Sequence, residues 1–204
     1  MKAPTIILAS SSKDREKIFE RAGIKFKIII SDFDEEELKK AHQTPIKLAE
    51  QLAKQKALNV KNKTEIEGEK AIIIAADTLV EFEGQIIGKA SDEKEAFKIL
   101  KKLNNTTHRL ISAIAITQTF DDKIIIDSDV SSVSFIELSD NEIEHYITTR
   151  EWEGRAGAYS INDKAALFID KIKGSSSTVM GIPMQKLFLI LKREFNYNLM
   201  QLGS

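Results

Sequence analysis

The chain has 204 residues, of which 42% are hydrophobic and 30% charged, as in an ordinary globular domain. Its net charge of -1 excludes the global positive field that would draw nucleic acid or an anionic membrane, so we expect neither as a partner. The absence of cysteine excludes disulfides, thiolate metal sites and a thiol nucleophile, and fits a cytoplasmic location. The three histidines, His42, His108 and His145, lack the spacing of a zinc site.

The first apolar stretch, residues 5–9, predicts a buried strand, and three serines at 10–12 separate it from a helical pattern. The start of such a helix offers free backbone N–H groups and a positive dipole end, which together favour a phosphate ligand. The alternative is that one serine simply caps the helix. Arg15 lies in the first turn, an unusual place for a cation unless an anion or an acidic neighbour compensates it.

Five acidic residues occur among positions 32–37, after a helix that ends at Gly23 and a short predicted strand at 26–30. Acidic residues are common in loops and at the starts of helices, which is the simpler explanation. A carboxylate at this place is also a suitable ligand for a magnesium ion.

The next predicted helix begins at Thr44 and Pro45 and continues to about Val60. Lys56 lies on this helix. Nothing in the local sequence distinguishes it from an ordinary solvent-facing lysine.

A central apolar run, residues 71–76, predicts a strand that is buried on both faces and stops at Asp77. Open α/β sheets bind their ligands where strands end, so Asp77 is a candidate for catalysis or metal binding. The alternative is a turn-forming aspartate. Glu83 and Gly84 then predict a hairpin turn, whose return strand leads to Lys89 and is expected to bring its ammonium near Asp77.

The second half of the chain predicts a long antiparallel hairpin between helices. Residues 150–163 contain the only tryptophan and show no period, as in a binding loop or a loop anchored by a buried tryptophan. In chain order the other predicted elements are a helix capped by Ser91, strands at 109–120 and 123–138, a helix with a capping box at Ser139, a strand at 165–172 and a last helix from Pro183.

Strands linked by helices in the first half, followed by a long hairpin, favour a mixed sheet. We therefore predict a single α/β domain over residues 1–204, with a central twisted mixed sheet, flanking helices and an elongated cleft.

Several motifs in one order resemble the Maf family of nucleotide pyrophosphatases, also called septum-formation or Maf-like proteins. The resemblance covers nearly the whole chain. Its motifs are ILASSSKDREKIF at 7–19, AADTLV at 75–80, GKASDEKEAFKILKKL at 88–103, TH at 107–108, RAGAYSI at 155–161 and VMGIP at 179–183.

The resemblance implies an enzyme that uses a divalent cation, usually Mg²⁺ with Mn²⁺ as an alternative, to split a nucleoside triphosphate into a monophosphate and pyrophosphate. It implies a house-cleaning role linked to division arrest, and a homodimer. The implied catalytic residues are Asp77, Lys89 and Arg15, the implied substrate-binding residues are Ser10, Ser12, Lys56, Thr78 and Asn162, and the implied metal ligands are Glu35 and Asp77.

Those roles agree with the chemistry, because phosphoanhydride hydrolysis needs cations on the phosphates, carboxylates for a metal and a base for water. For Asp77, the role of base and the role of metal ligand both remain open. Two positions depart from the family pattern: Asp14 replaces an arginine, and Asn162 replaces a glutamine. Thr78 is retained, and Asn162 keeps an amide that is one methylene shorter. The branch with the most similar motifs prefers dTTP and UTP, whereas other branches take 7-methyl-GTP or CTP.

Two other functions remain open. One is a house-cleaning enzyme for deaminated purine triphosphates such as ITP and XTP. The other is a nucleotide-binding regulator of division that does not catalyse hydrolysis. Direct binding of DNA or RNA is disfavoured by the balanced charge and the lack of a basic stripe.

Overall fold

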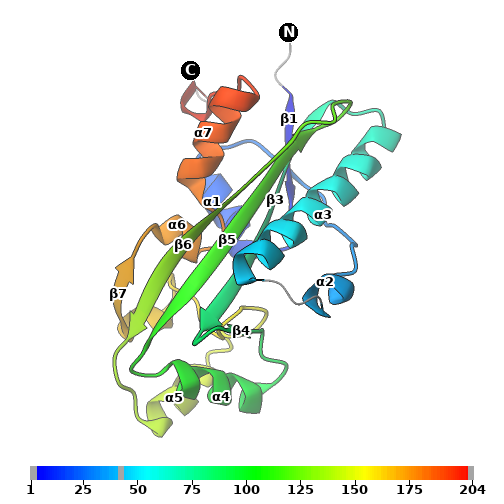
Figure 1. Cartoon of the computed structure of the whole chain (residues 1–204). Coiled ribbons are helices and arrows are strands. Elements are labelled where there is room, and N and C mark those ends of the chain that lie inside the picture. The colour runs from blue at the N-terminus through cyan, green and yellow to red at the C-terminus, as the bar shows by residue number, and fades with distance from the viewer. Residues whose placement is uncertain (1–3, 41–43, 202–204) are drawn as a thin grey trace. The chain divides into compact units, whose positions relative to one another are not determined.

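The computed structural model describes residues 4–40 and 44–201 (Figure 1), so His42 lies outside the described residues. These residues form two compact units. The first contains the chain up to Asp77, residues 112–129 and the chain from Gly181 on. The second contains residues 78–111 and 130–180. The expectation of one domain over residues 1–204 remains a prediction.

The described chain has an α/β fold with a mixed sheet and helices beside it, which confirms the predicted fold class (Figure 1). β1 runs parallel to both β2 and β3, whereas β3 with β4, and β6 with β7, are antiparallel pairs. The strand order is β2-β1-β3-β5-β6-β7, and β4 pairs with β3. The strands are β1 (Thr5–Ala9), β2 (Lys27–Ile28), β3 (Ala71–Phe82), β4 (Gln85–Ile87), β5 (Thr107–Gln118), β6 (Ile124–Phe135) and β7 (Ile169–Lys173).

The core of the first unit is formed by β1 and the first half of β3, which pair in register from Thr5 with Ala71 to Ala9 with Ala75. Apart from Thr5, these residues are buried, as expected of parallel strands with both faces covered. Three helices contribute fully buried side chains to this unit: Phe19 of α1 (Lys13–Arg21), Leu52 of α3 (Pro45–Ile66) and Leu187 of α7 (Met184–Glu194).

The helix α3 begins as predicted, with Thr44 as its N-cap and Pro45 in its first turn. It continues past the expected end near Val60, because Thr64 is fully buried and its hydroxyl donates to the Val60 carbonyl at 2.8 Å. A short helix, α2 (Glu36–Lys40), follows the acidic loop. The second strand is shorter than the predicted 26–30. β2 contains only Lys27 and Ile28, and both residues are exposed.

The predicted end of a strand at Asp77 is wrong, because β3 continues without interruption to Phe82. The apolar run ends at Ala76, but Val80 and the residues after it pair with β4, so the backbone stays extended. The predicted hairpin is confirmed. Glu83 and Gly84 have φ of 52° and 77°, as a tight turn between antiparallel strands requires.

In the second unit, α4 (Glu93–Leu103) and α5 (Asp140–Ile147) lie side by side (Figure 1). The capping box at Ser139 is confirmed. The prediction for α4 is corrected by one residue: the N-cap is Asp92, whose carboxylate accepts the Glu95 N–H at 2.8 Å, rather than Ser91. The buried Trp152 anchors the irregular segment by donating its indole N–H to the Ile147 carbonyl at 3.1 Å.

The predicted strand at 165–172 is partly wrong. Its first half is a 3₁₀ turn (Lys164–Leu167), in which the Phe168 N–H bonds to the Ala165 carbonyl, and β7 begins only at Ile169. The short helix α6 (Ser176–Val179) follows β7, and a second 3₁₀ turn (Leu199–Gln201) follows α7.

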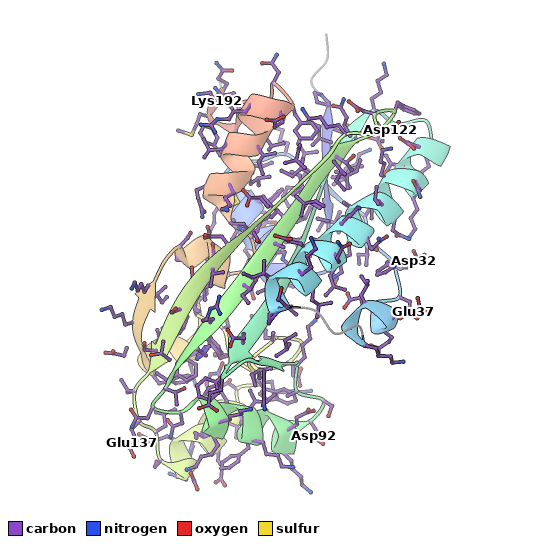
Figure 2. All side chains as sticks on the ribbon, viewed as in Figure 1. Asp32, Glu37, Asp92, Asp122, Glu137 and Lys192 are labelled. Carbon is purple, nitrogen blue, oxygen red and sulfur yellow. The ribbon has the colours of Figure 1, made fainter. Side chains whose placement is uncertain are left out.

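Charged side chains extend outward from the ribbon, as Figure 2 shows for Asp122 in the turn between β5 and β6 and for Lys192 on α7. None of the helices in residues 4–40 and 44–201 combines the length and the apolar character that a membrane span needs.

Candidate active site

Lys56 joins two carboxylates in the first unit. Its Nζ lies 2.5 Å from Asp77 Oδ1 and 2.7 Å from Glu35 Oε1, and its side chain is only 17% exposed. Three elements converge to make this cluster, since Lys56 comes from α3, Asp77 from the middle of β3 and Glu35 from the residue before α2. The sequence predicted each of these residues as a site residue through the family resemblance, and the structure brings them together.

Burial raises the pKa of Glu35, but hydrogen bonds from Lys56 and Lys39 outweigh this effect, so the pKa lies below its ordinary value. Lys39 Nζ lies 3.0 Å from Glu35 Oε2, the oxygen that does not bind Lys56. Glu35 is therefore ionised at neutral pH. The cluster thus holds an ionised carboxylate between two ammonium groups.

Arg15 is held in place by two acceptors. Its Nε donates to the Gly181 carbonyl at 2.8 Å, and its Nη1 donates to Ser10 Oγ at 3.1 Å. Burial lowers the pKa of Arg15, while the negative charges of Asp77, Asp14 and Glu35 oppose that effect. A guanidinium keeps its proton under these conditions, so Arg15 is an oriented cation beside the carboxylates. Its unexpected place in the first turn of α1 is thus explained by acidic neighbours.

Ser10 is oriented to donate. Its hydroxyl oxygen accepts from Arg15 and from the Ser12 backbone N–H, the latter at 3.2 Å, so its two acceptor positions are used and its O–H proton is directed elsewhere. Ser12 is the N-cap of α1, and its Oγ accepts from the Arg15 backbone N–H at 3.5 Å. Capping therefore accounts for Ser12 but not for Ser10, whose hydroxyl oxygen accepts from Arg15 instead.

Two residues that the sequence reasoning missed support the cluster. Asn59 lies one turn after Lys56, accepts from Ser31 Oγ at 3.2 Å and donates to Asp32 Oδ1 at 2.8 Å, which fixes the loop that carries Glu35. The other is Gly181, whose carbonyl orients Arg15. The sequence signal for Gly181 is its place in the VMGIP motif. The structure shows why a glycine is needed there, because its φ is +104°. An asparagine on a helix gives no such signal.

Three predicted site residues belong to the second unit. Thr78 follows Asp77 in β3 and is half-buried, whereas Lys89 and Asn162 are exposed. Lys89 forms an isolated antiparallel bridge with Ala156, within the RAGAYSI motif. The predicted approach of the Lys89 ammonium to Asp77 stays a prediction.

The donors of the cluster fit a hard divalent cation. Carboxylate oxygens are the ligands that Mg²⁺ prefers, and this ion is often bound by one or two carboxylates together with water and substrate phosphates. Within residues 4–40 and 44–201, no group of three or more His, Asp or Glu side chains is placed to hold a metal ion. Glu35 and Asp77 provide two carboxylates of the kind that such a site uses.

Among solved structures, the chain is similar to the Staphylococcus aureus Ham1 protein, with 14% identity, a TM-score of 0.35 and coverage of 64% of this chain and 71% of the other. It is also similar to a nucleoside-triphosphatase / dITP/XTP pyrophosphatase from Mycobacterium abscessus, with 13% identity, a TM-score of 0.34 and coverage of 64% and 72%.

Proteins named dTTP/UTP pyrophosphatase have a much higher sequence identity to this chain. The one from Alkaliphilus oremlandii (strain OhILAs) is 40% identical over 195 residues, which are 96% of this chain and 98% of that protein. The one from Thermoanaerobacter sp. (strain X514) is 38% identical over 195 residues, with coverage of 96% and 99%.

A family model described as Maf-like protein matches residues 5–194. The match contains every residue of the Lys56 cluster, together with Ser10, Arg15 and Gly181. The resemblance inferred from the motifs is thereby confirmed, and the chain belongs to the Maf-like protein family.

Proposed function

We propose that this protein is a nucleoside triphosphate pyrophosphatase that converts dTTP and UTP to the nucleoside monophosphate and pyrophosphate. The observation that carries the proposal is the Lys56 ammonium, bonded to both Asp77 and Glu35, beside an oriented Arg15. This arrangement occurs in a chain that is 40% identical, over nearly its full length, to a protein named dTTP/UTP pyrophosphatase.

Substrate binding in this proposal depends on cations and hydroxyl donors. Arg15 presents its guanidinium to the phosphates, because Gly181 and Ser10 already fix its direction. The O–H of Ser10 donates to a phosphate oxygen. Positioning and charge neutralisation of this kind supply most of the catalysis in phosphoryl transfer.

A divalent cation bound by Glu35 and Asp77 would neutralise charge on the phosphates. We propose Mg²⁺ as that ion, with Mn²⁺ able to replace it. Glu35 is suited to the role because its lowered pKa keeps it ionised. Before the substrate binds, Lys56 holds the two carboxylates in one orientation.

Asp77 accepts a proton from the attacking water in this mechanism. The only hydrogen bond to its carboxylate within the described part of the chain comes from Lys56 to Oδ1, so Oδ2 is available to water. The water oxygen bonds to a phosphorus atom next to the oxygen that bridges the α- and β-phosphates, and the bond from that phosphorus to the bridging oxygen breaks. The products are the monophosphate and pyrophosphate.

Three further residues predicted from the family resemblance are proposed to supply the remaining contacts. Lys89 is the third catalytic residue, because its ammonium would neutralise the negative charge that develops on the leaving group. Thr78 and Asn162 bind the substrate, and the amide of Asn162 offers both a donor and an acceptor to a base edge. Asp14 and Asn162 are the departures from the family pattern that bear on the choice of nucleotide.

A panel of triphosphates tests the function and its two alternatives. Pyrophosphate release with Mg²⁺ would be measured from dTTP, UTP, CTP, 7-methyl-GTP, ITP and XTP. We expect the highest kcat/KM for dTTP and UTP. Preference for ITP and XTP would identify a purine house-cleaning enzyme, and tight binding of nucleotides without any turnover would identify a regulator.

We further propose a homodimer in the cytoplasm that removes unwanted nucleotides, in a role linked to division arrest, with no nucleic acid or membrane as partner. The near-zero net charge and the lack of a membrane-length apolar run support the last point. Sedimentation equilibrium tests the dimer, since a single species at 22.9 kDa would contradict it.

A further inference from the structure

The ammonium of Lys56 occupies the place where a cation would meet both carboxylates. Its Nζ is within 2.7 Å of an oxygen of Glu35 and within 2.5 Å of an oxygen of Asp77. These are the two side chains that fit a divalent ion. A lysine this close to both oxygens therefore satisfies the pair with the protein's own positive charge.

The cluster is balanced in charge. The carboxylates of Asp77, Glu35 and Asp14 are matched by three cations, Lys56, Lys39 and Arg15. A free divalent ion that enters this cluster meets no excess negative charge, and it is repelled by an ammonium a few ångströms away. A nucleoside triphosphate changes the balance, because its phosphates add several negative charges and offer the ammonium new acceptors.

We infer that Lys56 is a resident counter-cation that keeps the Glu35 and Asp77 pair from binding a free divalent ion and releases the pair when its ammonium moves to the phosphates of the substrate. The inference rests on the proposed function. Metal and nucleotide then bind with positive coupling, and the protein does not hold a divalent ion tightly between turnovers.

A comparison of two lysines separates this role from a general effect of charge. Lys39 also bonds to Glu35, at 3.0 Å, but it does not contact Asp77 and its side chain is 47% exposed. Water screens such an exposed pair more strongly than it screens a buried one. Removal of Lys39 should therefore matter much less than removal of Lys56.

The test is direct binding of Mn²⁺ to the full chain without nucleotide, measured by the loss of the free-ion signal in electron paramagnetic resonance. We expect Lys56→Gln and Lys56→Met to bind Mn²⁺ at least about tenfold more tightly than the wild type. Lys56→Arg keeps the charge and should bind as weakly as the wild type. Lys39→Met, the matched control, should change the affinity less than about threefold.

Equal or weaker Mn²⁺ binding by the folded Lys56→Gln variant would overturn the inference. Near-ultraviolet circular dichroism establishes that each variant is folded. If the neutral variants do not fold, Lys56→Arg supplies the second comparison. A Mn²⁺ affinity of Lys56→Arg well above that of the wild type would also contradict the role of charge. Nucleotide hydrolysis by the wild type is measured separately. A wild type that hydrolyses dTTP while Lys56→Gln shows no gain in Mn²⁺ affinity refutes this inference alone, whereas no hydrolysis by the wild type refutes the proposed function.

Discussion

Arg15 depends on a backbone carbonyl for its orientation, because its Nε donates to Gly181 at 2.8 Å. Gly181 has φ of +104°, a conformation in which an alanine is strained, so Gly181→Ala would redirect that carbonyl. We expect the KM for dTTP to rise about tenfold, with a smaller change in kcat, because a charged hydrogen bond that positions a phosphate ligand is lost.

A double-mutant cycle checks that Gly181 acts through Arg15. In an Arg15→Lys background, Gly181→Ala should have little further effect on KM, whereas independent effects would multiply. Gly68→Ala is the control, since Gly68 also has a positive φ, of +72°, and a Cβ there meets nothing within 4 Å. Gly68→Ala should change the free energy of unfolding but not the KM for dTTP.

His108 is buried and uncharged in the folded protein. Burial lowers its pKa from 6.5 to about 4, and its Nε2 is paired with the Tyr159 hydroxyl at 2.8 Å. As pH falls from about 6.5 to about 4, the unfolded chain binds a proton at this histidine and the folded chain does not. The free energy of unfolding should therefore decrease over that window, by up to about 3 kcal/mol.

Urea unfolding between pH 7.5 and pH 4.5 measures this dependence. His108→Gln should remove this part of the pH slope, and the comparison uses slopes because the substitution also changes absolute stability. His145→Gln is the control, since His145 is exposed on α5. A slope that His108→Gln leaves unchanged would contradict the assignment.

The site residues were predictable only in part. Arg15 and Asp77 were candidates from their local sequence, and the serines at 10–12 and the acidic residues at 32–37 marked candidate ligand regions. The family resemblance singled out Ser10 and Glu35 within those regions and added Lys56, which is ordinary in its own sequence context. Lys56 and Asp77 are separated by 21 residues, and their contact is a tertiary event that no local pattern reports. Asn59 and Gly181 were missed for the same reason, since an amide and a backbone carbonyl act here only through distant partners.

At the scale of single elements, Asp92 and Ser91 are the two candidates for the N-cap of α4. Asp92 accepts the Glu95 N–H, whereas Ser91 contacts the Glu95 carboxylate. Asp92→Ala should lower the free energy of unfolding by about 1 kcal/mol, because an N-terminal backbone donor of α4 loses its acceptor. Ser91→Ala should cost clearly less. Chemical denaturation of the two variants decides, and a larger loss for Ser91→Ala would favour the cap expected from the sequence.

Apolar patterns predicted most elements and failed where polar residues continue a strand. β1, the start of α3 and the hairpin at Glu83 and Gly84 follow from periodicity and turn chemistry. The continuation of β3 through Asp77 did not follow, because the pairing of Val80 with Ile87 keeps the strand extended. That error concerns Asp77, the proposed catalytic base. Asp77 lies within a strand, so its carboxylate is buried and needs the ammonium of Lys56.

At the scale of the whole molecule, three strands contribute to both compact units. β3, β5 and β6 each run without interruption from residues of one unit into residues of the other. Unfolding of either unit would break the same strands, so we expect one cooperative transition, in agreement with the predicted single domain.

Two probes test that expectation in one thermal or urea experiment. Trp152, the only tryptophan, reports on the second unit by fluorescence, whereas far-ultraviolet circular dichroism reports on all helices and strands. Coincident midpoints are expected. An earlier fluorescence transition would show that the second unit unfolds independently, and would contradict the single-domain prediction.

The products formed from dTTP test the central claim most directly. Phosphorus-31 nuclear magnetic resonance of a reaction with Mg²⁺ would be compared for the wild type, for Asp77→Asn and for Asp140→Asn, a control on α5 whose carboxylate is 61% exposed. We expect dTMP and pyrophosphate in equal amounts from the wild type and from Asp140→Asn, and a loss of about 100-fold or more for Asp77→Asn. Formation of dTDP and inorganic phosphate, or full activity of Asp77→Asn, would contradict a pyrophosphatase centred on Asp77.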